Sequence, residues 1–132
     1  MSGGKPDSGK LYDIRFEHRA EYLYAYVTGE KDSVEISTQY WSEIAEECRQ
    51  NNYQKVLVEE DIIEAVASVF ELYQFAVQLP KYGFAGIYIA FVDRYIEQNE
   101  LNEFVELVAS NRGLMGRVFN DVTEAEKWLL SV

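Results

Sequence analysis

The sequence predicts an α/β domain, with an N-terminal β-hairpin followed by alternating helices and strands. Residues 11–18 alternate apolar and polar side chains, and residues 21–29 alternate aliphatic side chains with tyrosines, both with a period of two. The few residues between the two segments suit an antiparallel hairpin. Strand patterns then alternate with helical patterns of crossover length, which is typical of right-handed connections in a parallel sheet. We therefore expect a mostly parallel sheet of about five strands with about four helices.

The composition indicates one globular domain and excludes several classes of partner. The chain has 132 residues, of which 48% are hydrophobic, and its formal net charge of −11 repels nucleic acid and anionic lipid surfaces. Residues 1–10 form a polar segment predicted to be a flexible tail, and residues 11–132 form the domain. The start lacks the apolar stretch of a signal peptide, and no apolar run is long enough to span a membrane, so we expect a cytoplasmic protein.

The hairpin and the first helix have clear apolar faces. The predicted core-facing residues are Tyr12, Ile14 and Phe16 in the first strand, Leu23, Ala25 and Val27 in the second, and Ile36, Tyr40, Trp41, Ile44, Ala45 and Cys48 in a helix ending near Gln50. Asp32 and Glu35 have the spacing of a capping box at the start of that helix. The three tyrosines Tyr22, Tyr24 and Tyr26 share the other face of the second strand, where they either pack under a helix or form an exposed, self-associating stripe; we favour burial.

The remaining elements follow in turn. Residues 55–59 predict a strand buried on both faces, and residues 85–93 give the longest strand pattern, which we expect at the centre of the sheet. The residues predicted to face inward from three further helices are Val66, Val69, Phe70, Tyr73, Ala76 and Val77 before Pro80, then Leu101, Phe104, Val105 and Val108 before Gly113, and finally Ala125, Trp128 and Leu129 after a Thr123–Glu126 capping box. Residues 117–120 predict a last short strand.

Acidic and polar residues follow three of the predicted parallel strands. They are Glu59, Glu60 and Asp61, then Asp93 and Arg94, then Asn120 and Asp121. Ligands of open parallel sheets bind outside the carboxyl ends of the strands. These side chains therefore suggest three alternatives: ordinary solvation and helix capping, a surface for a protein partner, or a site for a small ligand or a divalent cation such as Mg²⁺.

Catalytic chemistry has little support in the sequence. His18 is the only histidine and lies at the hairpin end, and Cys48 lies on the apolar stripe of a helix, so no nucleophile is paired with a base. The glycines of "GFAG" and "GLMG" are too few for a phosphate-binding loop. Arg112 in "NRG" suits a cap or a surface contact. We expect no enzymatic activity, no bound cofactor and no metal.

The order of motifs resembles the STAS-like superfamily, the small α/β domains named after sulphate transporters and anti-sigma factor antagonists. The resemblance rests on the hairpin ending in "TGE", then "VLVEE", "GIYIAFVD", "NRG" and "EAEKWL", and within the superfamily it is to uncharacterised bacterial single-domain proteins. In well-understood members a serine at a helix start is phosphorylated and switches binding to an anti-sigma factor. Ser68 falls near that position, but the surrounding Asp-Ser-Ser-Gly motif is replaced by "VASV". The sequence therefore predicts an ordinary helix residue there, with regulatory phosphorylation of Ser68 as the alternative.

Taken together, the patterns predict a non-enzymatic regulatory module that binds a partner protein. The candidate interaction surface consists of Glu60, Asp61, Glu64, Ser68 and Asp93. The identity of the partner is not indicated, and a homodimer is possible. The alternative is binding of a small ligand or a divalent metal in an acidic cleft at the same strand ends.

Overall fold

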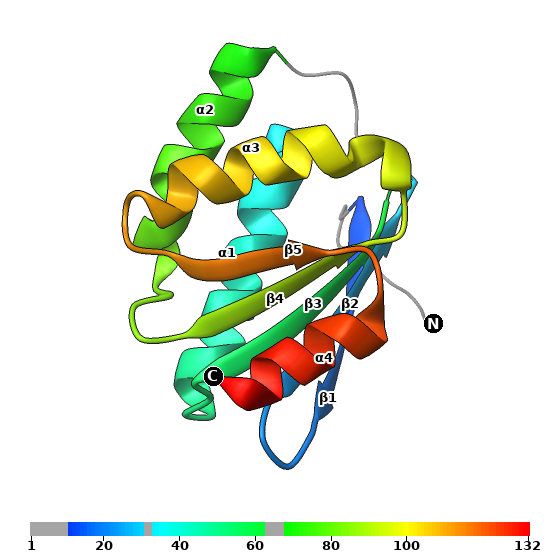
Figure 1. Ribbon diagram of the computed structural model, residues 1–132, viewed down its shortest axis with the longest axis vertical. Coiled ribbons are helices and arrows are strands. Elements are labelled where there is room, and N and C mark those ends of the chain that lie inside the picture. Colours follow the sequence, from blue (N-terminus) through cyan, green and yellow to red (C-terminus); the bar gives the residue numbers. More distant parts are fainter. Residues whose placement is uncertain (1–10, 31–32, 63–67) are drawn as a thin grey trace.

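The computed structural model describes residues 11–30, 33–62 and 68–132, which form one five-stranded sheet with helices on both faces (Figure 1). The strands are β1 (Tyr12–His18), β2 (Leu23–Gly29), β3 (Lys55–Asp61), β4 (Tyr88–Asp93) and β5 (Met115–Phe119). The α-helices are α1 (Val34–Gln50), α2 (Val69–Gln78), α3 (Asn99–Ser110) and α4 (Val122–Ser131), and two short 3-10 helices are η1 (Leu79–Tyr82) and η2 (Ile96–Gln98). No helix of the described residues has the length and apolar character needed to cross a membrane.

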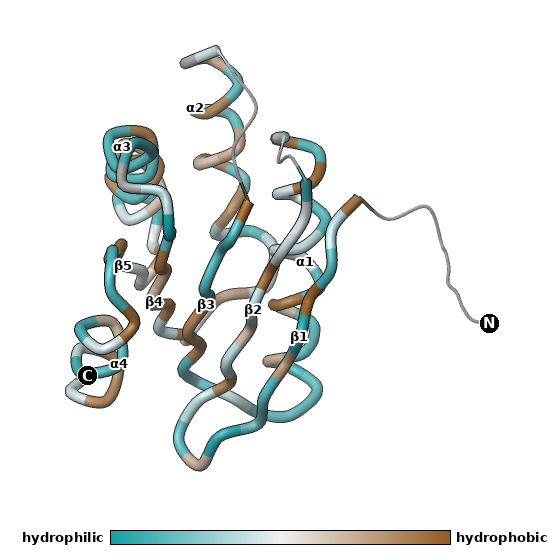
Figure 2. The backbone as a smooth tube through the Cα atoms, turned by 90° about the vertical axis from the view of Figure 1, so that its right-hand side faces the viewer, coloured by the Kyte–Doolittle hydropathy of each residue, from teal (hydrophilic) through white to brown (hydrophobic). Residues whose placement is uncertain are grey.

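The sheet has the strand order β1-β2-β3-β4-β5, which can be followed across Figure 2. β1 and β2 pair antiparallel, and every later pair is parallel. This arrangement confirms the predicted mixed α/β fold with its opening hairpin. The central strand is β3 and not β4, because each crossover adds its new strand on the same side of the previous one.

The larger core lies between the sheet and helices α1, α2 and α3. Leu23, Ala25 and Val27 of β2 face this core, as predicted, and the stripe of α1 that includes Tyr40, Trp41 and Cys48 packs on them. α1 ends at Gln50, the residue at which its apolar pattern stops. The period of two in β2 and the period of about 3.6 in α1 therefore predicted both partners of this interface.

The second core lies on the opposite face, under α4. Tyr22 and Tyr24 are buried there against Ala125 and Leu129, so the tyrosine face of β2 is packing and not an exposed stripe. The Tyr22 hydroxyl donates a hydrogen bond to Glu126 on α4, with 2.5 Å between the oxygens. The phenol groups thus supply apolar area to the core while their hydroxyls find polar partners at its border.

Two predicted helix caps are shifted by one or two residues. Ser33 is the N-cap of α1, since its hydroxyl accepts a hydrogen bond from the Ile36 amide; Asp32 lies outside the described residues. The N-cap of α4 is Asp121, whose carboxylate accepts from the amide of Thr123 at 3.0 Å, so the predicted Thr123 cap is wrong. Both errors arise because each helix start has two good capping residues within two positions of each other, and only the backbone geometry selects one.

The inward face of α2 also differs from the prediction. Phe70 and Tyr73 point to solvent, and the buried residues are Leu72, Phe75 and Ala76. The prediction that Phe70 and Tyr73 face the core is wrong, because α2 is apolar on almost every side and its sequence permits two stripes. As a result, α2 exposes two aromatic side chains that the sequence alone did not place at the surface.

Candidate functional site

The alternation of β3 divides its three acids between the two faces of the sheet. Glu59 and Asp61 face α4, and Glu60 faces the layer of α1, α2 and α3, because neighbouring residues of a strand point in opposite directions. Asp93 is aligned with Glu60 in the parallel pair of β3 and β4. The acids that the sequence placed at one edge therefore belong to two separate environments.

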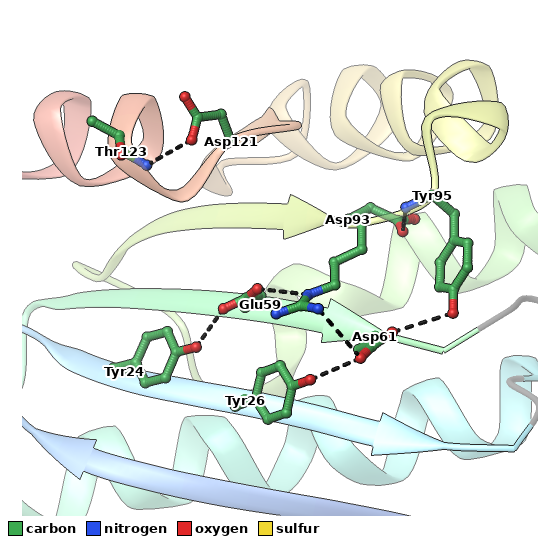
Figure 3. A network of polar contacts seen from close by, with 9 residues as sticks. Tyr24, Tyr26, Glu59, Asp61, Asp93, Tyr95, Asp121 and Thr123 are labelled. Atoms are coloured by element: carbon green, nitrogen blue, oxygen red, sulfur yellow. Dashed lines mark hydrogen bonds and ion pairs between the residues drawn. The ribbon is translucent and has the colours of Figure 1, made fainter.

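On the α4 side the acids are held in a network with tyrosines (Figure 3). The Tyr24 hydroxyl donates to Glu59, and the Arg94 Nε atom lies 2.9 Å from the other carboxylate oxygen of Glu59. Asp61 accepts hydrogen bonds from the hydroxyls of Tyr26 at 2.7 Å and Tyr95 at 3.2 Å. We call these residues, Tyr24, Tyr26, Glu59, Asp61, Arg94 and Tyr95, the tyrosine–carboxylate network.

The network pairs two carboxylates with one guanidinium and with tyrosine hydroxyls. Burial raises the pKa of Tyr24, and its hydrogen bond to the Glu59 carboxylate raises it further. The hydrogen bond to Glu59 also raises the pKa of Arg94. The hydroxyls therefore stay protonated and the guanidinium stays charged, so the acids act as acceptors that connect β2, β3 and the end of β4.

Asp93 has a structural role at the end of β4. Its side chain is 0% exposed and accepts three hydrogen bonds: from the Tyr95 backbone amide at 2.9 Å, from the Gln98 side chain at 2.6 Å and from the Asn102 side chain at 2.8 Å. These contacts fix the turn through η2 and the start of α3. Asp93 was predicted as part of an interaction surface, and its complete burial removes it from any surface of the described structure.

Glu60 is buried as well, with 1% of its surface exposed, and the Tyr40 hydroxyl donates a hydrogen bond to its carboxylate. It lines a pocket of about 820 Å³, a volume that includes the open mouth. The pocket lies between α1 and α3, with the sheet as its floor. It is lined by Ser33, Val34, Ser37, Tyr40, Trp41, Glu60, Leu72, Phe75, Leu79, Ile89, Phe91, Leu101, Asn102, Val105, Glu106, Leu114, Gly116, Arg117 and Val118.

The pocket has a polar end and an apolar end. Ser33, Ser37, Tyr40 and Glu60 lie near the carboxyl ends of the parallel strands, because α1 begins there and Glu60 is the second-last residue of β3. Towards the opposite edge of the sheet the lining is aliphatic and aromatic: Leu79, Ile89, Phe75 and Leu114. A mainly apolar and aromatic lining with a few polar groups is the usual composition of small-molecule sites in proteins.

The other predicted site residues are dispersed. Asp61 is partly exposed within the tyrosine–carboxylate network, and Glu64 lies outside the described residues. Ser68 is exposed and is the N-cap of α2, where its hydroxyl accepts from the Glu71 amide and lies 3.2 Å from a Glu71 carboxylate oxygen. Ser68 therefore has an ordinary structural role, as the cap of α2 and not as a residue inside the helix. The positive end of the α2 helix dipole would stabilise a phosphate on Ser68, and the Glu71 carboxylate would repel it.

The groups considered for catalysis lie apart. His18 is at the exposed hairpin end, where its ring nitrogens contact Tyr53 and Glu47. Cys48 is buried in α1, and burial raises the pKa of its thiol to about 12. Among residues 11–30, 33–62 and 68–132, no three His, Cys, Asp or Glu side chains are placed together as metal ligands.

Arg112 has a capping role, because it donates to a carbonyl of the last turn of α3 and to the Tyr73 hydroxyl.

The sequence did not predict the pocket, although one of its walls has a recognisable pattern of hydroxyl-bearing residues. Ser33, Ser37 and Tyr40 are spaced by four and three residues, and so they share one face of α1 with the apolar stripe. Hydroxyl groups interrupting an apolar stripe at helical spacing indicate a polar contact inside the core. Here that contact is the wall of a pocket next to Glu60.

Comparison with known proteins gives one line of support, for the fold. No protein-family model and no curated protein matches the sequence. One similar solved structure is described as an uncharacterized protein of the DUF3478 family with a SpoIIAA-like fold, from Shewanella loihica PV-4. The match covers 96% of this chain and 99% of that one, with 14% sequence identity and a TM-score of 0.51. This chain therefore has the SpoIIAA-like, or STAS-like, fold that its sequence motifs predicted.

Proposed function

We propose that this STAS-like domain is a non-catalytic binding module whose ligand is a small, largely apolar molecule held in the pocket between α1 and α3. The observation that carries the proposal is the pocket itself, which combines a long aliphatic and aromatic lining with a few polar groups at one end. Burial of apolar ligand surface supplies the affinity, and the polar end supplies orientation. Of the two alternatives in the sequence, the geometry favours the small ligand over a protein docked on the acids.

The absence of catalysis in this proposal rests on the chemistry of the groups near the pocket. Cys48 is buried in the α1–sheet core with a raised thiol pKa, which leaves little thiolate at neutral pH. His18 lies at the hairpin end, in contact with Glu47 near the last turn of α1, whereas the polar end of the pocket lies at the first turns of α1. Neither side chain lines the pocket, and so neither is positioned to act on a bound molecule.

Titration with the neutral fluorescent probe N-phenyl-1-naphthylamine tests the proposal. We expect saturable binding with one site per chain. The variant Val105→Trp places a large ring in the pocket and should weaken binding at least tenfold, because Val105 lines the pocket from α3. Leu101→Trp, at the more exposed rim, serves as a second blocking variant if Val105→Trp is poorly folded.

The matched control is Leu107→Trp, which adds the same ring to the same helix at an exposed position outside the pocket lining. It should bind the probe as the wild type does. If the wild type shows no saturable binding, or if the blocking variants and Leu107→Trp bind alike, the pocket is not a ligand site and the proposal fails.

A second candidate function is binding of a protein partner, and exposed aromatic residues on α2 favour it. Phe70 is 67% exposed and Tyr73 is 41% exposed; they lie three residues apart on one face of α2, immediately after the exposed Ser68. Large exposed aromatic side chains are common at protein interfaces. This surface retains Ser68 from the predicted interaction set and replaces the buried Glu60 and Asp93.

Site-specific crosslinking distinguishes this second candidate. A photoreactive phenylalanine analogue at position 70 should give a discrete protein adduct in cells, or a crosslinked dimer of the purified chain. The same analogue at Leu130, an exposed position on α4 on the other face of the sheet, is the control and should give neither. Identical adduct patterns from the two positions would exclude α2 as a specific interface.

A further inference from the structure

We propose that the ligand of the pocket is a neutral amphipathic molecule whose hydroxyl group donates a hydrogen bond to the side-chain oxygen of Asn102. The inference rests on the proposed function and adds the chemical class of the ligand. The occupant is an aliphatic or cyclic alcohol, with its hydroxyl at the start of α3 and its apolar body along the aliphatic lining of the pocket.

The first argument is the orientation of the Asn102 side-chain amide. Asn102 lines the pocket from the start of α3 and is 7% exposed, and its Nδ2 atom donates to the Asp93 carboxylate at 2.8 Å. An ionised carboxylate can only accept, so the amide nitrogen must lie on the side of Asp93. The two ends of the amide are therefore not interchangeable, and the Oδ1 atom is directed away from Asp93.

The second argument is the surroundings of the Asn102 Oδ1 atom. Within the described part of the chain, no residue donates a hydrogen bond to this oxygen, and the atom is not sealed inside the core. The space that Asn102 borders is the pocket. A bound molecule that covered the oxygen without donating to it would leave a buried acceptor unpaired, which costs free energy. A ligand with a donor at this point avoids that cost.

The third argument distinguishes a hydroxyl from a charged head group. An amide oxygen carries only a partial charge, so it cannot replace the hydration that an ammonium group loses on entering an apolar pocket. An ionised carboxylate has no hydrogen to donate, and the Asp93 carboxylate lies behind the Asn102 amide and would repel it. A neutral hydroxyl donates to the oxygen and loses the least hydration.

The fourth argument is the direction in which the pocket becomes apolar. Asn102 lies close to the carboxyl end of β4, because it is bonded to the last residue of that strand. Val105 lines the pocket one turn further along α3, and Leu79, Ile89 and Leu114 continue the aliphatic lining. A molecule with one hydroxyl group and an apolar body matches this arrangement in one orientation only.

Competition against N-phenyl-1-naphthylamine with 1-octanol and its isomer 1-methoxyheptane tests the inference. The two compounds have the same atoms and similar length, but only the alcohol has a hydrogen-bond donor. Octanol should displace the probe with a Kd at least about threefold lower than that of the ether, as expected for one neutral hydrogen bond.

The variant Asn102→Leu removes the acceptor at similar volume and should abolish this preference while both compounds still bind. The control is Asn99→Leu, which changes the same type of side chain at the start of the same helix. Asn99 bonds to Asn120 and is outside the pocket lining, so this variant should retain the preference.

A measurement on the wild type accompanies the variants, because Asn102→Leu also removes the bond to Asp93 and may lower stability. The carbon-13 resonance of the Asn102 side-chain carbonyl reports directly on its oxygen. It should shift more on saturation with octanol than on saturation with methoxyheptane.

The outcomes separate the inference from the proposed function. If the probe binds but the two isomers compete equally, if the preference survives in Asn102→Leu, or if both isomers shift the Asn102 carbonyl alike, the pocket binds ligands and the hydroxyl assignment is wrong. If octanol binds Val105→Trp as well as the wild type, it binds elsewhere and the assignment is also wrong. If the probe does not bind the wild type at all, the proposed function fails and the inference fails with it.

Discussion

Replacing Asp93 by alanine should lower the free energy of unfolding by about 3 to 5 kcal/mol, because three buried donors lose their acceptor together. The donors are the Tyr95 amide and the side-chain amides of Gln98 and Asn102, all within 2.9 Å of the carboxylate. Gln98 and Asn102 are themselves buried, so water replaces the lost bonds poorly. Urea unfolding followed by circular dichroism measures the change as a lower midpoint with an unchanged slope.

Asp93→Asn is the sharper variant, because it keeps the size of the side chain. One carboxylate oxygen of Asp93 accepts hydrogen bonds from the side-chain amides of both Gln98 and Asn102. An amide nitrogen in the place of that oxygen is itself a donor, so neither bond could form. The control is Asp121→Ala, which removes an exposed acid with a single capping bond and should cost about 1 kcal/mol. If Asp93→Ala is no more destabilising than Asp121→Ala, Asp93 is not the structural junction described here.

The regular part of the fold follows directly from the sequence. Each strand pattern in the described residues corresponds to a strand, and the six apolar residues predicted for α1 are all buried. These elements are predictable because their apolar residues permit one orientation only: Leu23, Ala25 and Val27 have polar or aromatic neighbours that belong to the other face. The buried face of α2 was predicted wrongly because its apolar residues permit more than one orientation. Phe70 and Leu72 are both apolar, and tertiary packing decides which of them is buried.

The candidate site was predictable only in part. The sequence placed acids at the carboxyl ends of the strands, and the structure has them there. The period of two within "EED" already implies that Glu60 points away from Glu59 and Asp61, and this signal was overlooked. For the pocket, the sequence carries only the hydroxyl groups that lie on the apolar stripe of α1. The pocket depends on the distance at which α1 and α3 lie on the sheet, and that distance follows from the packing of many side chains at once.

Replacing Leu129 by alanine should destabilise the domain by about 3 kcal/mol and should do so mainly through α4. Leu129 is 0% exposed and lies in the core beneath α4 with Leu57, Ala90 and Ala125. α4 is the helix that covers this face of the sheet, so a cavity here cannot be closed by shifts of α1, α2 or α3 on the other side. The lost contacts also lie beside Tyr24, whose hydroxyl donates to Glu59.

The adjacent Leu130→Ala is the matched control for this change, because Leu130 has the same side chain on the same turn of α4 and is 42% exposed. It should cost less than about 1 kcal/mol. Hydrogen exchange should show faster exchange of α4 amides in Leu129→Ala, with protection of α1 retained until global unfolding, because α1 packs on the opposite core. Equal stability of the two variants would mean that α4 is held by its rim contacts, chiefly the Tyr22–Glu126 hydrogen bond, and not by burial of its leucine.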